Sequence, residues 1–302
     1  MEIMDTTIIY HAHRISENYI FPCPDGLAAA WVALKKFPGS KTIPCAYPSY
    51  DTPFDRIPYM VNKQVVVVDF SVHPLVIDAW KKNGCDVTII DHHQTAIEFL
   101  SSIRSQLKGI LDCRKCGAVL TWEYYFPDKP IPAFLYLVQD RDCGKLWELP
   151  QEEYWESDAS YFHKYSSMMK RSYSFYDQVE HLSKEALVEI AREHVGDFLV
   201  KKRKSCERKM SSFVRGKLDN YTVGYIYLAS GSISSDLAKM YLDLNPDVDL
   251  AFINVKDTKV SLRSSVGKNI NVAAIASSFG GGGHKNAAGF TLTKPVENFV
   301  SF

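Results

Sequence analysis

Hydrophobic and polar positions alternate along the first half of the chain in a pattern typical of short buried strands separated by helices. Three apolar runs predict strands at residues 6–13, 64–71 and 86–93. Elsewhere apolar residues recur every three or four positions, which predicts helices. These helices are expected at residues 25–37, 73–84, 116–126 and 131–142. Because continuous apolar strands are buried on both faces, the pattern predicts an α/β fold with a parallel sheet between helical layers.

The second half of the chain predicts a smaller α/β domain after a helical region. Residues 143–181 are expected to form irregular helices, and residues 183–216 form one long amphipathic pattern. After Gly216 the pattern predicts further strands and helices. The strands are expected at 221–229, in a hairpin at 248–265 and at 287–293, and the helices at 232–245 and 271–283. We therefore expect an N-terminal domain at 1–182, a helical linker at 183–216 and a C-terminal domain at 217–302.

Charge and cysteine content narrow the class of protein. The chain has 302 residues, with 35 Lys and Arg against 35 Asp and Glu, so it has no global field for holding a long polyanion. If its substrate carries phosphate, local recognition in a pocket is favoured. Seven scattered cysteines, no stretch of signal-peptide type and no apolar run of membrane-spanning length indicate a reducing, cytoplasmic setting without a membrane partner. The sequence leaves the oligomeric state open, a homodimer included.

Titratable side chains gather where the predicted strands end. They are His11 and His13 after the first strand, Asp69 after the second, and Asp91, His92 and His93 after the third. Asp25 precedes one helix, and Asp140 and Asp142 end another. Because the carboxyl ends of parallel strands line one edge of a sheet, these groups can converge there.

Imidazole and carboxylate groups without thiolate suit Mn²⁺, Fe²⁺, Co²⁺ or Zn²⁺. Two such ions a few ångströms apart can hold a phosphoryl group for attack by water, and Asp69 is the candidate for the carboxylate between them. Taken singly, each acid could instead be a helix cap or turn residue.

A glycine-rich stretch lies near the C-terminus. "FGGGGHKNAAGF" at 279–290 contains Gly281, Gly282 and Gly283 directly before His284. Glycines let backbone N–H groups approach an anion closely, so we expect phosphate recognition here rather than a flexible turn. Arg263 ends a preceding strand and could bind phosphate with both guanidinium nitrogens, or form a surface salt bridge.

The order of these motifs resembles the DHH phosphoesterase family with a C-terminal DHHA1 domain. The motifs are "CPDG", "VVVVDFS", "TIIDHH", "VQDRD", "VSLRSS" and "FGGGGHKNAAGF", spread over nearly the whole chain. The family includes RecJ-like exonucleases, nanoRNA and cyclic-dinucleotide phosphodiesterases and, with a different second domain, exopolyphosphatases and family II pyrophosphatases. The resemblance implies a parallel-sheet DHH catalytic domain, a mixed-sheet DHHA1 domain that binds substrate, and two metal ions. Mn²⁺ is expected, with Mg²⁺ or Co²⁺ as alternatives.

The resemblance also implies a role for each motif residue. His11 and Asp25 would hold one metal, Asp69 would bridge, and His92 and Asp140 would hold the second. Asp91 would orient its neighbours, and His93 would face the phosphate. From the second domain, substrate would be bound by Arg263, Gly281, Gly282, Gly283 and His284.

Two features depart from the family pattern. Many members read D-x-D in the first motif, where this chain reads Asp25-Gly26-Leu27, so the second carboxylate is absent. Residues 12–24 also separate His11 from Asp25 as a loop insertion, which leaves His13 as an alternative ligand.

The combined expectation is a metal-dependent phosphoesterase that hydrolyses phosphodiester bonds of short oligonucleotides or dinucleotides with a metal-activated water. Hydrolysis of phosphoanhydrides, as in polyphosphate or pyrophosphate, is the alternative within enzymes. A non-catalytic metal or nucleotide sensor is the alternative outside them.

Overall fold

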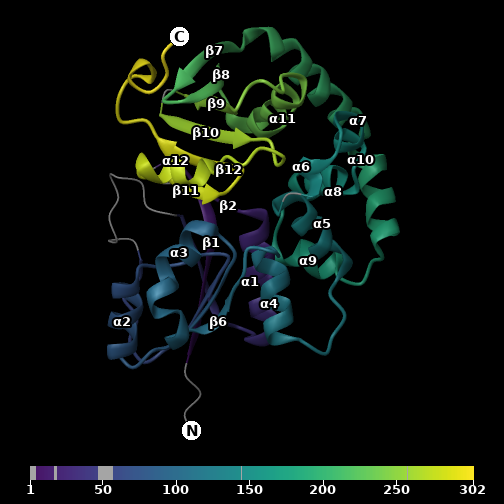
Figure 1. Cartoon of the computed structure of the whole chain (residues 1–302). Helices are drawn as coiled ribbons and strands as arrows, with labels where there is room; N and C mark the ends of the chain where they lie inside the picture. Colours follow the sequence, from purple (N-terminus) through teal and green to yellow (C-terminus); the bar gives the residue numbers. More distant parts are fainter. Residues whose placement is uncertain (1–4, 17–18, 47–56, 144, 257) are drawn as a thin grey trace. The chain divides into compact units, whose positions relative to one another are not determined.

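The computed structural model describes residues 5–16, 19–46, 57–143, 145–256 and 258–302. The chain divides into two compact units (Figure 1). Unit 1 comprises Met1–Gly144 and Asp158–His194, and unit 2 comprises Lys145–Ser157 and Val195–Phe302. The segment 145–157 therefore belongs to unit 2, although the chain on both sides of it belongs to unit 1. The domain boundaries expected at residues 182 and 216 stay predictions.

Unit 1 is built on a mostly parallel sheet, as the sequence predicts. In the described residues the sheet has six strands in the order β2-β1-β4-β5-β6, with β3 also paired to β1. Among its described strands, only the β1–β2 pair is antiparallel. The strands are β1 (Thr6–Ser16), β2 (Tyr19–Pro22), β3 (Lys41–Cys45), β4 (Gln64–Val68), β5 (Asp86–Asp91) and β6 (Lys108–Leu111).

The four valines of β4 explain why its apolar run is continuous. Val66 and Val68 pack into the hydrophobic cluster on one face of the sheet, and Val65 and Val67 pack into the cluster on the other. Side chains of a strand alternate between faces, so a sheet covered twice needs apolar residues at every position. One face is covered by α1 (Pro24–Lys36), α4 (Gly117–Tyr125), α5 (Ala133–Asp142), α8 (Asp158–Met168) and α9 (Tyr173–Val179). The other is covered by α2 (Pro74–Lys82) and α3 (Gln94–Leu100), which the 3₁₀-helix η2 (Ser101–Gln106) follows.

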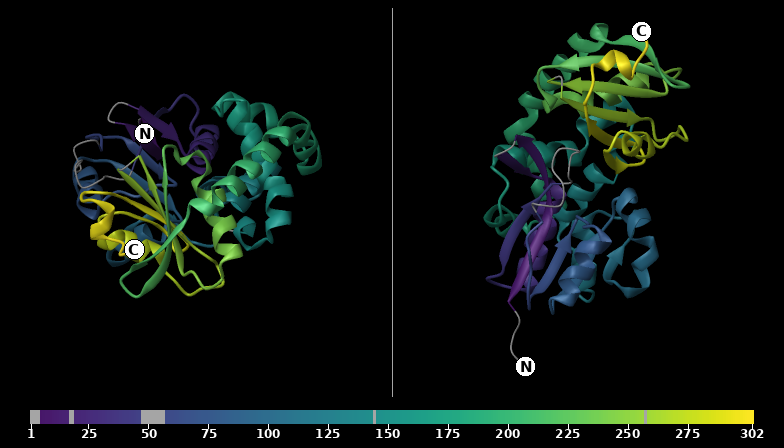
Figure 2. Two further views of the ribbon diagram at one scale, coloured as in Figure 1. Left: turned by 90° about the horizontal axis from the view of Figure 1, so that it is seen from above. Right: turned by 90° about the vertical axis from the view of Figure 1, so that its left-hand side faces the viewer.

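Unit 2 contains a mixed sheet, also as predicted. Its order is β11-β12-β10-β9-β8-β7, and only β8 and β9 pair in parallel within the described residues. Figure 2 draws the chain from two further sides. The strands are β7 (Val214–Leu218), β8 (Tyr221–Leu228), β9 (Leu250–Val255), β10 (Lys259–Ser264), β11 (Gly282–His284) and β12 (Ala287–Thr291). The other elements are α6 (Lys145–Glu148), α7 (Gln151–Glu156), α11 (Ser234–Leu244), α12 (Val272–Ser278), η3 (Met210–Ser212), η4 (Gly231–Ile233) and η5 (Val296–Asn298).

The long helix expected between the sheets is α10 (Lys184–Lys209). It ends earlier than its amphipathic pattern suggests, because residues 214–218 pair with β8 as strand β7. The sequence did not predict the short strands β2, β3, β6, β7 and β11 or the helix α3. The helix expected at 271–283 ends at Ser278, and β11 begins at Gly282. In the described part of the chain, we find no helix long and apolar enough to cross a membrane.

Candidate metal centre

The candidate site lies at the carboxyl ends of the parallel strands of unit 1. His11 pairs with Cys45 at the last parallel position of β1, Asp69 follows β4, and His92 follows β5. Because β3 lies on one side of β1 and β4 on the other, the strand order reverses between β1 and β4. Ligands of open α/β sheets bind at such a switch point. The fold thus brings the strand-end side chains to the edge where a ligand is expected.

The first strand was predicted to end at His13, but it continues beyond this residue. β1 continues to Ser16 and pairs antiparallel with β2, so residues 12–24 are not simply an inserted loop. The error arose because β2 is short and pairs only with this extension of β1. His11 Nδ1 lies 3.4 Å from Asp69 Oδ2, whereas His13 is exposed. The geometry therefore favours His11 over His13 as a ligand.

Asp69 occupies the centre of the site. Its φ angle is 52°, and its backbone N–H donates to the carbonyl of Ile90 at 2.8 Å. Asp tolerates this left-handed conformation better than most residues, but it remains uncommon and often marks a functional position. Its carboxylate is 1% exposed, with Oδ1 2.9 Å from His92 Nε2 and Oδ2 on the side of His11. The two oxygens thus face two different histidines, as a bridging carboxylate requires.

Donor groups collect on both sides of Asp69. One cluster contains His11, Cys23 and Asp69, and another contains Asp25, Asp69 and His92; within each cluster the donor atoms lie within 4.8 Å of one another. Asp25 Oδ2 lies 3.4 Å from His92 Nε2. Asp25 is therefore grouped with His92, and not with His11 as the family resemblance implied. Asp69 belongs to both clusters.

The acid that α5 brings to the site is Asp142. Its Oδ2 lies 3.3 Å from His92 Nε2, and it forms a further cluster with His92 and Cys143. Asp140, the expected ligand, belongs to none of the clusters found among the described residues. Residues two apart on an α-helix point about 200° apart, so only one of these acids can face the site.

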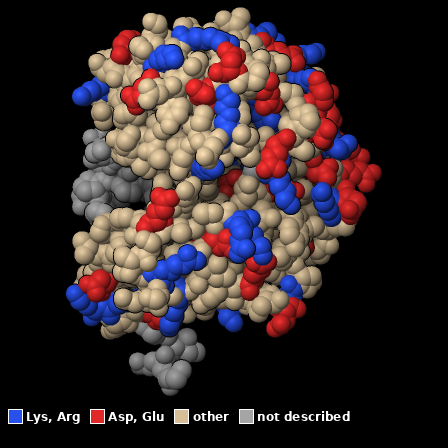
Figure 3. Space-filling model, in the orientation of Figure 1, with Lys and Arg blue, Asp and Glu red and all other residues tan. Residues whose placement is uncertain are grey.

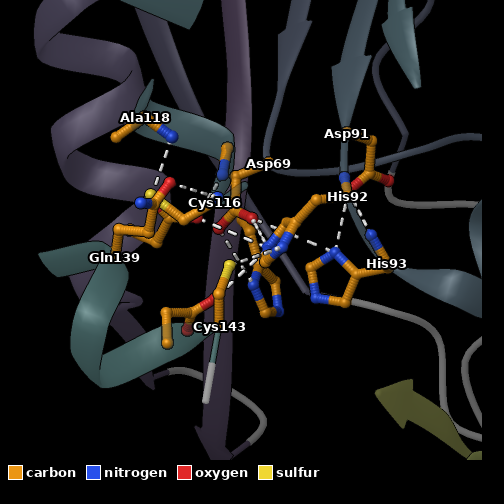
Figure 4. Close-up of polar contacts among 12 residues, drawn as sticks. Asp69, Asp91, His92, His93, Cys116, Ala118, Gln139 and Cys143 are labelled. Atoms are coloured by element: carbon orange, nitrogen blue, oxygen red, sulfur yellow. Dashed lines mark hydrogen bonds and ion pairs between the residues drawn. The ribbon is translucent and has the colours of Figure 1, made fainter. Parts of the chain in front are cut away.

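Asp91 holds the two histidines of the motif in place (Figure 4). Its Oδ1 accepts hydrogen bonds from the backbone N–H of His92 at 2.7 Å and from His93 Nδ1 at 2.8 Å. Its Oδ2 accepts a hydrogen bond from Ser71 Oγ at 2.6 Å. On His92, Nε2 faces the carboxylates and Nδ1 lies 3.7 Å from Cys143 Sγ. Such contacts behind a ligand fix its ring orientation.

The first motif is anchored by a neighbouring helix. The carboxylate of Asp25 accepts hydrogen bonds from the backbone N–H groups of Gly117 at 2.6 Å and Ala118 at 2.9 Å, at the start of α4. Leu27, at the position where the family pattern has a second carboxylate, packs in the hydrophobic core. Cys23, two residues before Asp25, lies at the site instead.

The buried acids and histidines of the site shift one another's pKa values. Burial, with the charges of Asp69 and Asp142, raises the pKa of Asp25 well above its ordinary value. Burial alone would raise the pKa of Asp69, but His11 and His92 outweigh it and hold this pKa well below the usual range. Burial alone would lower the pKa of His92, but Asp69, Cys143 and Asp142 raise it well above normal. Without a metal ion, the proton on His92 supplies the positive charge that Asp69 needs.

The donor set fits a divalent cation. Both carboxylate oxygens of Asp69 and Oδ2 of Asp142 are buried, and in the described part of the chain none accepts a hydrogen bond of good geometry. Buried carboxylate oxygens are costly to leave without donors, and metal coordination is a common way to satisfy them. A cation between Asp69 and the histidines would meet this need.

The residues expected to bind phosphate lie together in unit 2. Arg263 on β10 pairs with Ala287 on β12, and its guanidinium donates to the carbonyl of Leu262 at 2.8 Å and to Ser235 Oγ at 3.0 Å. Gly282, Gly283 and His284 form β11, the neighbour of β12. The glycine stretch in β11 therefore lies next to β12, and β12 lies next to β10, which carries Arg263.

Two glycines of this stretch have a structural role. Gly280 has a φ angle of 74°, and its backbone N–H donates to the carbonyl of Ser277. The backbone N–H of Gly281 donates to the carbonyl of Ala276. This is the Schellman arrangement that ends a helix, here α12. The N–H of Gly281 therefore satisfies a helix carbonyl, which leaves Gly282, Gly283 and His284 as the candidates for anion contact.

Sequence reasoning did not single out Cys23 or Cys143, and it named Asp142 without a role. A signal for Asp142 existed, because Leu135 and Val138 mark the buried face of α5 and Asp142 follows Val138 by one helical turn. For Cys23 the only signal was its place two residues before Asp25.

Comparisons with known proteins agree with this picture. Residues 219–302 match the family model of the DHHA1 domain. An uncharacterised protein of Acanthamoeba polyphaga mimivirus is 28% identical over 304 residues, which cover 95% of this chain and 67% of that protein. Oligoribonuclease NrnB of Bacillus subtilis is 25% identical over 245 residues, which cover 72% of this chain and 56% of NrnB. This chain thus spans only part of the length of each of these relatives.

A solved structure shares the fold. RecJ from Thermus thermophilus, in complex with Mn²⁺, superposes with a TM-score of 0.52 and 13% sequence identity. The match covers 96% of this chain and 49% of the RecJ chain. The likeness covers nearly the whole chain and supports the α/β fold class.

Proposed function

We propose that this chain, as a member of the DHH/DHHA1 phosphoesterase superfamily, hydrolyses phosphodiester bonds of short oligonucleotides or dinucleotides with the help of divalent cations. The observation that carries the proposal is the position of Asp69. Its two oxygens face His92 at 2.9 Å and His11 at 3.4 Å, at the switch point of the sheet. Two-metal phosphoryl-transfer sites need one shared carboxylate between two sets of ligands.

The residues divide into two candidate ligand sets around Asp69. His92, Asp25 and Asp142 would hold one cation, and His11 would be the imidazole ligand of the other. Mn²⁺ suits imidazole and carboxylate ligands, and Mg²⁺ and Co²⁺ are alternatives. When bound, such ions would supply Lewis acidity and lower the pKa of a water molecule to near neutrality.

His93 is the proposed contact for the substrate phosphate. Burial alone would lower the pKa of His93, but the carboxylate of Asp91, 2.8 Å from Nδ1, raises it above the ordinary value. A protonated imidazole oriented in this way can donate to a phosphate oxygen through Nε2. In the DHHA1 domain, we propose that Arg263, Gly281, Gly282, Gly283 and His284 contribute to binding the nucleotide, with Gly281 acting through its role in ending α12.

Two observations support a short substrate: the chain has no net charge, and one of its relatives is an oligoribonuclease. NrnB, which is 25% identical, is an oligoribonuclease. On the face drawn in Figure 3, acidic and basic side chains of the described residues are interspersed, and the formal net charge is zero. Processive binding of long nucleic acid generally needs a continuous basic track. The favoured substrate class is therefore a di- or oligonucleotide bound in a pocket.

One competition assay tests this proposal. The purified chain with Mn²⁺ would receive a 5′-phosphorylated dinucleotide and tripolyphosphate in the same tube, with products separated by anion exchange. His92→Ala is the inactivating variant. His181→Ala, which changes an exposed histidine of the same unit, is the matched control.

We expect mononucleotides from wild type and from His181→Ala, and none from His92→Ala. Release of phosphate from tripolyphosphate alone would move the chain to the phosphoanhydride hydrolases. No turnover of either compound by protein that binds Mn²⁺ would contradict the proposal and favour a sensor.

A further inference from the structure

Cys23 lies inside the candidate metal centre and is 5% exposed. Its sulfur, a nitrogen of His11 and a carboxylate oxygen of Asp69 lie within 4.8 Å of one another. Zinc–ligand distances of about 2.0–2.3 Å put two ligands of one ion at most about 4.6 Å apart. The spacing of the three groups is thus close to that of ligands around a single ion.

The backbone explains why Cys23 and Asp25 serve different sides of Asp69. Cys23 has an extended conformation, with φ −61° and ψ 137°, and directly precedes α1. Asp25 lies in the first turn of that helix and is held by the N-terminus of α4. Cys23 is grouped with His11, and Asp25 is grouped with His92.

A second observation points to a cation between these groups. Both oxygens of Asp69 are buried and accept no hydrogen bond of good geometry in the described part of the chain. The oxygen on the side of His11 is Oδ2, at 3.4 Å from Nδ1. The carboxylate of Asp69 therefore offers an oxygen toward the same space that Cys23 and His11 border.

We propose that Cys23 is a metal ligand, so that the His11 half of the centre has one nitrogen, one sulfur and one oxygen donor. This inference rests on the proposed metal centre and specifies its ions. In the His92 half, Nε2 of His92 faces oxygens of Asp25, Asp69 and Asp142. The sulfur of Cys143, which clusters with His92 and Asp142, lies 3.7 Å from the other ring nitrogen, Nδ1.

The two halves should then differ in metal preference. Thiolate ligands favour Zn²⁺, and in general the later first-row ions, over Mn²⁺ and Mg²⁺, which prefer oxygen ligands. The His11 half is therefore expected to select Zn²⁺ or Co²⁺, whereas the His92 half accepts Mn²⁺ or Mg²⁺. A centre loaded with two different ions follows from this arrangement.

Two other cysteines must be distinguished from Cys23. Cys143 contacts Nδ1 of His92, on the opposite edge of the ring from the nitrogen that faces Asp69. Cys85 is buried in the hydrophobic cluster of α2. Cys143→Ser is therefore the matched control near the site, and Cys85→Ser is the control away from it.

Cobalt spectroscopy tests the proposal without reference to activity. Metal-free protein would be titrated with Co²⁺, and the near-ultraviolet sulfur-to-cobalt charge-transfer band would be recorded. We expect the band in wild type, Cys143→Ser and Cys85→Ser, and its loss in Cys23→Ser. Co²⁺ binding without the band in wild type, or a band that survives in Cys23→Ser, would overturn the assignment.

A second variant guards against a folding defect in Cys23→Ser. Cys23→Asp replaces sulfur by oxygen, and calorimetry would compare its affinity for Zn²⁺ and Mn²⁺ with that of wild type. Since even changes behind a ligand alter metal affinity about 10–100-fold, the Zn²⁺-to-Mn²⁺ affinity ratio should fall by roughly tenfold or more. An unchanged ratio in a variant with the wild-type circular dichroism spectrum would contradict the proposal.

The outcome can be separated from that of the proposed function. A charge-transfer band without hydrolysis of any phosphoester would support Cys23 and contradict the enzymatic proposal. Hydrolysis with Mn²⁺ but no band with Co²⁺ would support the enzyme and contradict Cys23.

Discussion

Gly117 and Asp69 are in direct contact, and position 117 has no room for a side chain. A Cβ atom on Gly117 would lie 2.6 Å from Cβ and 2.9 Å from Cα of Asp69. The backbone N–H of Gly117 also donates to Asp25 Oδ2 at 2.6 Å. One glycine at the start of α4 therefore sets the positions of two candidate ligands. A similar close approach occurs in the first motif, where a Cβ on Gly26 would lie 2.3 Å from the carbonyl oxygen of His11.

Gly117→Ala should destabilise the protein and weaken metal binding together. The added methyl group meets Cβ and Cα of Asp69, which cannot move without shifting the backbone, and such overpacking costs about 1–3 kcal/mol. Urea unfolding followed by tryptophan fluorescence, with calorimetry of Mn²⁺ binding, would measure both effects. Gly196→Ala is the control, because a Cβ added there would meet nothing within 4 Å and its helical site should gain about 0.5–1 kcal/mol. Gly117→Ala with wild-type stability and Mn²⁺ affinity would contradict this account.

Substitution of Asp69, Asp142 and Asp140 should reduce activity by amounts that decrease in that order. Asp69→Asn should reduce activity by more than roughly 100-fold, beyond the range of changes behind a ligand, because Asp69 belongs to both ligand clusters. Asp142→Asn should cost less than Asp69→Asn, and Asp140→Asn should stay within about twofold of wild type, as most substitutions outside special sites do. Steady-state kinetics on a dinucleotide would give the order. A loss in Asp140→Asn equal to that in Asp142→Asn would return the ligand role to Asp140.

Some of this site was predictable from the sequence because it depends on strand ends. The buried valines before Asp69 and the apolar run before Asp91 indicated two parallel strands, and parallel strands end at one edge. Helix faces were harder, since the choice between Asp140 and Asp142 depends on which side of α5 meets the sheet. The buried positions Leu135 and Val138 mark the side of α5 that meets the sheet, and Asp142 lies on that side.

Cys23 could not be assigned from local pattern. It precedes a helix in extended conformation, and no periodicity fixes the direction of a side chain there. Its position follows from the pairing of β2 with the end of β1, which brings the chain back beside His11 before α1 begins. Such a short antiparallel pair is a tertiary feature that four residues of sequence do not reveal. The boundaries of the domains likewise depend on long-range packing.

Asp91→Asn should lower the pKa of His93. The Asp91 carboxylate lies 2.8 Å from His93 Nδ1, and its charge raises the pKa of this histidine against the opposing effect of burial. Removing this nearby opposite charge favours the neutral imidazole, so the titration of His93 should move to lower pH. Proton NMR of the metal-free protein would follow the histidine resonances. Ser71→Ala, which removes only the hydrogen bond to Oδ2 of Asp91, should have a smaller effect. An unaltered His93 titration in Asp91→Asn would show that this pair does not control the proton.

The stability of the metal-free protein should fall as pH rises above the ordinary histidine pKa of about 6.5. The pKa of His92 is raised well above that value, chiefly by Asp69 against the effect of burial, and the pKa of His93 is also raised. A group whose pKa is higher in the folded state stabilises the fold fully below its unfolded-state pKa. That contribution is lost as pH rises through the folded-state value.

Metal binding should reverse this dependence. A histidine ligand must be neutral, so the affinity for Mn²⁺ should increase over the same pH range in which His92 loses its proton. Thermal unfolding from pH 6 to pH 9, with and without saturating Mn²⁺, would measure both trends. We expect the melting temperature to fall with pH in the metal-free protein, and the stabilisation by Mn²⁺ to grow with pH. His92→Gln should reduce both slopes, since glutamine carries no titrating proton. A metal-free melting temperature that rises over this range would contradict a protonated His92 as the partner of Asp69.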